Sequence, residues 1–108
     1  MREADIQNTI RMALSKHGIV LRLNNGQFMT KDGREIRSGL PPGTSDLLFI
    51  GRGYIAFIEV KTPDGRVSEA QQRFITTMQQ YGHRAGIARS VEDALYIIGE
   101  GSNHGIQC

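Results

Sequence analysis

Three charged side chains interrupt two apolar segments in the middle of the chain. Asp46 opens the segment DLLFI, and Glu59 and Lys61 lie near the end of the next segment, YIAFIEVK. β-Branched and aromatic residues dominate both segments, and a glycine-containing turn at 51–53 joins them, a pattern that predicts two buried strands. Burying a charge costs on the order of several kcal/mol unless the charge is paired or bound to a metal. We therefore expect these charges to serve chemistry.

Strand geometry brings the three charges together. Alternation along a strand places Glu59 and Lys61 on one face and Val60 on the other. An antiparallel hairpin turning at 51–53 then sets Asp46 near the height of Glu59. One lysine cannot neutralise two acids, so negative charge remains where solvation is poor. Mg²⁺ prefers oxygen ligands, often one or two carboxylates. The pattern thus predicts a Mg²⁺ or Mn²⁺ site beside a lysine; a structural ion pair is the alternative.

The remaining elements must support this hairpin. Helical spacing, turn residues and capping patterns predict an α/β fold with a mixed β-sheet flanked by helices, in the order αβββαβ with a C-terminal helix. The expected elements are a helix over 2–17, strands over 19–23 and 27–30 joined by the turn Asn24-Asn25-Gly26, a loop over 31–44, strands over 45–50 and 54–61, a helix over 68–81, a strand over 85–88, a helix over 91–98 and a loose tail over 99–108.

The stretch GTSD, followed after a turn by IEVKT, resembles the core of the PD-(D/E)xK nuclease superfamily, which has a restriction-endonuclease-like fold. Asp46 and the run Glu59-Val60-Lys61 occupy its motif positions. More narrowly, the chain resembles a stand-alone VRR-NUC domain of the phage or bacterial type. The resemblance implies a single nuclease domain over 1–108 that hydrolyses DNA phosphodiester bonds with Mg²⁺ or Mn²⁺.

The resemblance extends beyond the core. It includes an acidic residue early in the first helix, the Gly-x-x-Asp entry, Ser68-x-x-Gln71 and the strand over 82–89. One residue departs from the family pattern: Ser45 precedes the aspartate where proline is common. That position shapes the backbone and supplies no ligand, so the departure does not predict inactivation.

Three further residues have expected roles at the site, and for Glu3 and Gln71 the resemblance supports them. Glu3 is either a first-turn acid favourable to the helix dipole, worth roughly 0.3–1 kcal/mol, or a third carboxylate that reaches the pocket and helps to hold a second ion. Gln71 closes a capping box with Ser68 and, in the family, also borders the active site. The main-chain carbonyl of Val60 is an expected backbone ligand of the metal, together with Asp46 and Glu59.

Basic residues flank the expected site in sequence. Lys31, Arg34 and Arg37 precede Asp46, and Arg66 follows the second strand. We expect these four side chains to contact DNA phosphates. The chain has no tryptophan, offers no aromatic platform for single strands and shows no helix typical of major-groove readers. Recognition of DNA shape or backbone is therefore expected rather than recognition of sequence.

Stand-alone domains of this type imply a branched substrate, in particular four-way (Holliday) junctions. A homodimer would match this use, because a junction resolved symmetrically needs two cuts. The apolar stretch Leu95–Ile98 either buries one face against a second copy or packs within its own chain. A non-specific or nicking DNA-processing nuclease, phage or restriction-associated, is the alternative function. A non-catalytic DNA-binding module is a further one.

Composition agrees with a small globular domain. The 108 residues are 39% hydrophobic and 22% charged, and the net charge of +2 fits a nucleic-acid partner without requiring one. The single cysteine, Cys108, excludes an internal disulfide and a cysteine-based zinc site, and favours a reducing cytosol. We expect the cytoplasm of a bacterial or phage-infected cell, no membrane association and, without a nucleotide-binding motif, no organic cofactor.

Overall fold

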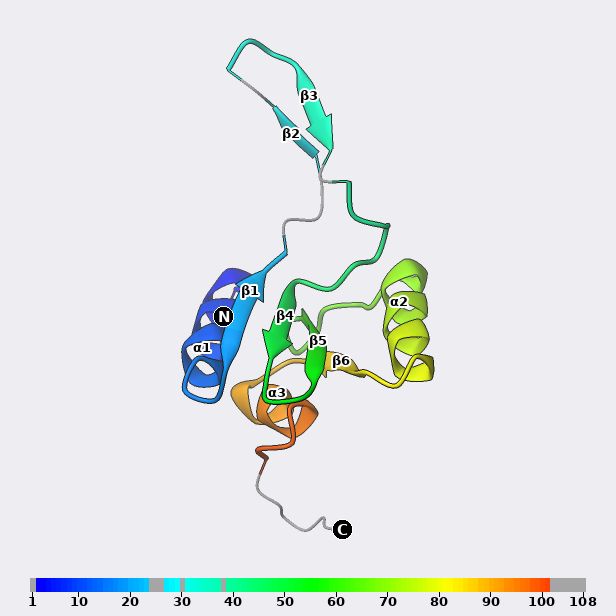
Figure 1. The fold of residues 1–108 in the computed structure, drawn as a ribbon. Coiled ribbons are helices and arrows are strands. Elements are labelled where there is room, and N and C mark those ends of the chain that lie inside the picture. The colour runs from blue at the N-terminus through cyan, green and yellow to red at the C-terminus, as the bar shows by residue number, and fades with distance from the viewer. Residues whose placement is uncertain (1, 24–26, 30, 38, 102–108) are drawn as a thin grey trace.

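The computed structural model describes residues 2–23, 27–29, 31–37 and 39–101 and has a mixed α/β architecture (Figure 1). In chain order the elements are α1 (Glu3–Leu14), β1 (Ile19–Arg22), β2 (Gln27–Met29), β3 (Glu35–Arg37), β4 (Leu47–Ile50), β5 (Ile55–Val60), α2 (Glu69–Gln80), β6 (Arg84–Ala88) and α3 (Val91–Ile97). The predicted fold class is confirmed. Within the described residues, no helix is long and apolar enough to cross a membrane.

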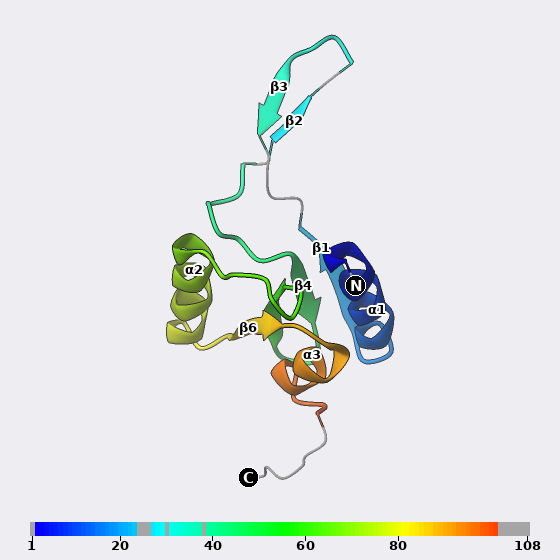
Figure 2. The same cartoon turned by 180° about the vertical axis from the view of Figure 1, so that it is seen from behind.

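Four strands form a mixed sheet in the order β1-β4-β5-β6. Strand β4 is antiparallel to both β1 and β5, and β6 is parallel to β5. A parallel neighbour needs a crossover connection, which α2 supplies. Helices α1 and α3 cover one face of the sheet. Helix α2 covers part of the other face (Figures 1 and 2). The rings of Phe74 and Phe57 meet edge to face there, with 5.3 Å between their centroids.

The hydrophobic core lies between the sheet and helices α1 and α3. Helical spacing in α1 and alternation in β4 and β5 select its members, as the sequence patterns require. The fully or nearly fully buried members are Ile6, Ile10, Leu14, Leu47, Phe49, Ala56, Ile58, Val60, Ala88, Ala94 and Ile98. The apolar end of α3 is therefore used within its own chain: Ile98 is buried, Leu95 and Ile97 pack against the core, and only Tyr96 is strongly exposed, at 68%.

The predicted pairing of the first two strands is wrong. Strand β1 pairs with β4, with Arg22 opposite Leu47, and not with the segment that follows it. This pairing sets Val20 opposite Phe49 and joins β1 to the core sheet. Segment 31–44 is not all loop either, because β3 pairs with β2 in a separate two-stranded sheet. The expected turn at 24–26 and the end of the tail, 102–108, lie outside the described residues.

The β2–β3 sheet forms an arm that stands away from the body of the molecule (Figures 1 and 2). Since β1 is antiparallel to β4, the chain leaves β1 at the end of the sheet where β4 begins, and it returns from the arm to that same end. The arm therefore projects from the end of the sheet at which Asp46 and Glu59 lie.

Candidate active site

Two carboxylates face each other where β4 begins and β5 ends. Asp46 immediately precedes β4, and the pairing of Leu47 with Ile58 sets it opposite Glu59. Its Oδ2 accepts a hydrogen bond from the Val60 N–H at 3.0 Å. The hairpin geometry expected from the sequence is therefore observed, and a main-chain donor fixes the aspartate.

Glu59 is almost completely enclosed. Only 3% of its side chain is exposed, and the neighbouring Lys61 side chain is 13% exposed. Oε2 of Glu59 accepts a hydrogen bond from Nε2 of Gln71 at 2.8 Å and lies 3.7 Å from Nζ of Lys61. Oε1 is buried and has no hydrogen-bond partner in the part of the chain that the structure describes. Buried acceptors without a partner are rare in folded proteins and call for an explanation.

The surroundings disfavour charge on both acids. Burial raises the pKa of Glu59 to about 7, and the negative charges of Asp46 and Glu3 add to that effect. The charge of Lys61 and a backbone hydrogen bond from Asp46 oppose it. Burial also raises the pKa of Asp46, against the hydrogen bond from Val60 and the attraction of Lys61 and Arg22. One lysine does not offset two buried carboxylates. A divalent cation placed here would relieve the excess negative charge.

Gln71 takes part in two sets of hydrogen bonds. In the capping box of α2, its Oε1 accepts from the Ser68 N–H at 2.9 Å, and its own N–H donates to Oγ of Ser68 at 3.1 Å. The nitrogen of its side-chain amide, Nε2, donates to Oε2 of Glu59. The same side chain thus starts the helix and orients the buried carboxylate.

Close packing ties the loop before Asp46 to α2. Gly43 has a φ of 85°, a left-handed conformation that favours glycine. A Cβ at this position would collide with the carbonyl of Ala70 and the nitrogen of Gln71. The glycine of the Gly-x-x-Asp entry therefore lets the backbone that carries one acid lie against the helix turn that carries the amide.

Glu3 lies at the rim of this group. It is exposed, begins α1, and is near enough for its charge to contribute to the raised pKa of Glu59. However, the described ranges contain no cluster of three His, Cys, Asp or Glu side chains that could hold one ion. The structure thus brings together Asp46 and Glu59, and the third-carboxylate role of Glu3 stays a prediction.

The predicted DNA-contacting residues belong to the two chain segments that flank the site in sequence. Lys31 and Arg34 are exposed on the arm, where Arg34 pairs with Asp32 at 3.6 Å. Arg66 is exposed between β5 and α2. Arg37 belongs to β3, and its side chain is outside the described part of the chain.

One basic residue near the site was missed by the sequence analysis. Arg22 ends β1, opposite Leu47, and its charge counteracts the raised pKa of Asp46. Its position follows only from the pairing of β1 with β4. The sequence showed a basic residue at the end of the first strand. However, the expected hairpin paired that strand with the segment over 27–30 and not with β4.

The raised pKa of Glu59 predicts that the metal-free protein loses stability as pH rises. The folded pKa of about 7 exceeds the ordinary value of 4.5, so between these values the folded state binds more protons than the unfolded state and the free energy of unfolding falls with pH. The gap of about 2.5 corresponds to about 3 kcal/mol in total. Urea denaturation in EDTA at a series of pH values from 4.5 to 8 measures this fall in the free energy of unfolding. Glu59→Gln should flatten the curve, and a wild-type curve already flat over this window would contradict the assignment.

The comparisons with known proteins identify the family and support the fold. The family model for the VRR-NUC domain matches residues 1–92. A solved structure described as a VRR_NUC domain superposes with a TM-score of 0.62 at 23% identity, covering 89% of this chain and 92% of that chain. At that identity the structural match supports the fold. A comparison with curated proteins found no match.

Proposed function

Because this chain belongs to the VRR-NUC family of nuclease domains, which supports its assignment as a DNA nuclease, we propose that it hydrolyses DNA phosphodiester bonds with Mg²⁺ or Mn²⁺ held by Asp46 and Glu59. One observation carries the proposal. The buried Oε1 of Glu59 lacks a hydrogen-bond partner among the described residues, and a second carboxylate lies opposite. A structural ion pair would explain the contact of Lys61 with Oε2 and would leave Oε1 unexplained.

The donor set suits a hard divalent cation. Oε1 of Glu59 and the Asp46 carboxylate, whose Oδ2 already accepts from Val60, are oxygen ligands of the kind that Mg²⁺ prefers. The Val60 carbonyl is the proposed main-chain ligand, and Glu3 at the rim is proposed to assist a second ion. When bound, such an ion makes water a better nucleophile at neutral pH and offsets the charge of the phosphate.

The side chains around the acids have separate tasks in this proposal. Lys61 places a positive charge 3.7 Å from Oε2 of Glu59, where it orients the attacking water and stabilises charge that develops on the phosphate. Gln71 keeps Glu59 in one orientation through its 2.8 Å hydrogen bond. The Val60 N–H does the same for Asp46. Preorganised groups of this kind need no rearrangement during the reaction.

DNA binding is proposed to come from the basic residues that flank the site. Lys31 and Arg34 lie on the arm, which projects from the same end of the sheet as the acids, and Arg66 follows β5. Arg37 is part of this proposed set. Such contacts are made to the DNA backbone and position it without reading sequence.

We further propose branched DNA, in particular a four-way junction, as the substrate and a two-fold homodimer as the active form. One domain carries one site, and a symmetric pair would deliver the two cuts that a junction requires. A nicking or non-specific DNA-processing nuclease is the competing proposal, because the same chemistry serves both.

A cleavage assay over a panel of DNAs tests the function. A four-way junction, a flap, plain duplex and single strands are incubated with Mg²⁺, Mn²⁺ or EDTA. We expect cleavage with either metal, none in EDTA, and at least about tenfold faster cutting of the junction, which corresponds to about 1.4 kcal/mol of selectivity. Equal rates on all substrates would favour the competing proposal. An absence of cleavage on every DNA with both metals would contradict the nuclease proposal itself.

A further inference from the structure

Arg89, the residue after β6, reaches across to a distant turn of the chain. Its Nη1 donates to the carbonyl oxygens of Thr62 at 2.7 Å, Pro63 at 3.2 Å and Gly65 at 2.8 Å. Three main-chain acceptors thus converge on one nitrogen. Since carbonyl oxygens repel one another, this arrangement of the turn depends on the cation at its centre.

Both sides of this contact are anchored. The backbone N–H of Arg89 donates to Oδ2 of Asp93 at 2.9 Å, and the N–H of Asp93 donates to Oγ of Ser90 in the cap of α3. On the other side, the N–H of Lys61 donates to the carbonyl of Ala88 at 3.0 Å. The guanidinium therefore spans two fixed points.

The turn that Arg89 holds connects two side chains of the proposed site. Lys61 directly precedes Thr62, and the chain after the turn leads into α2, which carries Gln71. These two side chains are the ones that contact Oε2 of Glu59. The turn has its own hydrogen bond, from the Gly65 N–H to the Thr62 carbonyl at 3.0 Å. That bond closes the turn but does not fix its orientation relative to the sheet.

We propose that Arg89 is a positioning residue for the nuclease site. By holding the Thr62–Gly65 turn against the end of β6, it fixes Lys61 and Gln71 relative to Glu59 without contacting DNA itself. The expected loss of catalysis rests on the proposed function. Its size follows from the sensitivity of reaction rates to geometry, because a misplacement of about 1 Å at a reacting group can cost about a hundredfold in rate.

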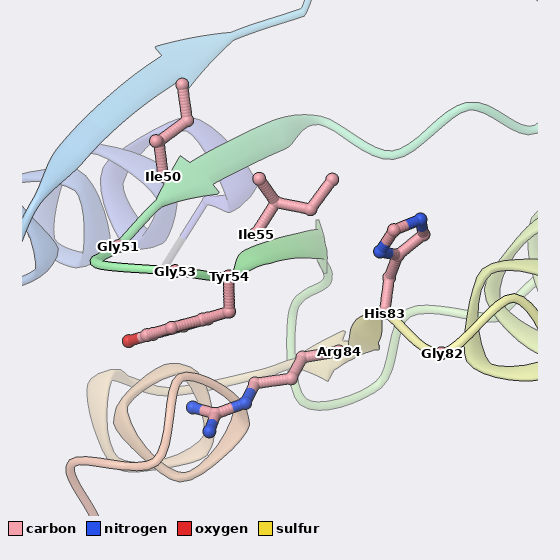
Figure 3. A pocket seen from close by; sticks show the side chains of 8 residues that line it. All are labelled: Ile50, Gly51, Gly53, Tyr54, Ile55, Gly82, His83 and Arg84. Atoms are coloured by element: carbon pink, nitrogen blue, oxygen red, sulfur yellow. The ribbon is translucent and has the colours of Figure 1, made fainter.

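Arg84 provides a matched control. It begins the strand that Arg89 follows, donates from its guanidinium to the carbonyl of Ile98, and lies over the Tyr54 ring, 4.0 Å from the ring centroid (Figure 3). It lines a hollow of about 630 Å³ at the opposite end of the sheet from the acids. Its loss removes contacts of a similar kind but cannot move Lys61.

The experiment compares Arg89→Met, Arg89→Lys and Arg84→Met with the wild type. Arg89→Met should lower kcat roughly a hundredfold and leave KM within about twofold, because uniform DNA binding is kept. Arg89→Lys should recover most of kcat, since an ammonium keeps the positive charge and presents three donors on one nitrogen, where Nη1 presents two. Arg84→Met should lower the melting temperature about as much as Arg89→Met while keeping kcat within about threefold.

A second readout does not depend on cleavage. The side-chain amide signal of Gln71 in a ¹⁵N–¹H NMR spectrum should shift in Arg89→Met and stay in place in Arg84→Met. A wild-type kcat in Arg89→Met, an equal loss of kcat in Arg84→Met, or an unshifted Gln71 signal would each overturn the positioning role. A wild-type protein that cuts no DNA would refute the proposed function instead, and the NMR comparison would still decide the positioning.

Discussion

Glu59→Gln is expected to slow DNA cleavage by about a thousandfold or more while making the metal-free protein more stable. The amide has nearly the same shape, and its oxygen can still accept the hydrogen bond from Gln71. What disappears is the buried negative charge, whose enclosure raises the pKa of Glu59 to about 7. Removing that charge should increase the free energy of unfolding at pH 8 by about 3 kcal/mol.

The two effects of Glu59→Gln have opposite signs, so partial unfolding cannot explain both. Single-turnover cleavage with saturating Mg²⁺ measures the first, and urea denaturation in EDTA at pH 8 measures the second. Glu92→Gln, at an exposed position in the first turn of α3, is the matched control. It should change neither the cleavage rate nor the free energy of unfolding by much. A Glu59→Gln variant that cuts DNA at the wild-type rate would remove Glu59 from the reaction.

Lys61→Met should reduce the rate of cleavage by about 10²–10³-fold even when DNA and Mg²⁺ are saturating. Loss of one preorganised electrostatic contact to a transition state has that size, and Lys61 supplies the ammonium paired with Glu59. The methionine keeps most of the apolar stem and loses the charge. Since the effect concerns charge that develops during reaction, higher substrate concentration should not restore the rate.

Lys16→Met serves as the control for Lys61→Met. Lys16 is exposed just after the end of α1, so its loss changes the net charge of the protein equally without touching the site. Comparable cleavage rates in the two variants would mean that Lys61 contributes only general charge.

The central hairpin was predictable because its signals are local. Two apolar segments rich in β-branched and aromatic residues, joined by the glycine turn, predict the hairpin in which Asp46 faces Glu59. The partner of β1 was not predictable in the same way. Asn24-Asn25-Gly26 is a strong local hairpin signal, but the choice between two partners depends on burial across the whole sheet. Pairing with β4 joins Val20 to the core and leaves β2 to pair with β3.

Other features of the site needed three dimensions. The sequence indicated that Gln71 caps α2, whereas its hydrogen bond to Glu59 depends on how closely α2 approaches the sheet. The unpartnered Oε1 of Glu59 is likewise a property of packing. Arg89 contacts carbonyls 24–27 residues earlier in the chain, and no local pattern connects these positions.

Anomalous scattering from crystals soaked in MnCl₂ tests most directly whether Asp46 and Glu59 hold a divalent ion. A peak between the two carboxylates in the wild-type protein, absent from Glu59→Gln crystals treated identically, is the predicted result. Wild-type crystals with no peak there, and with the two carboxylates turned away from each other, would contradict the proposed metal site.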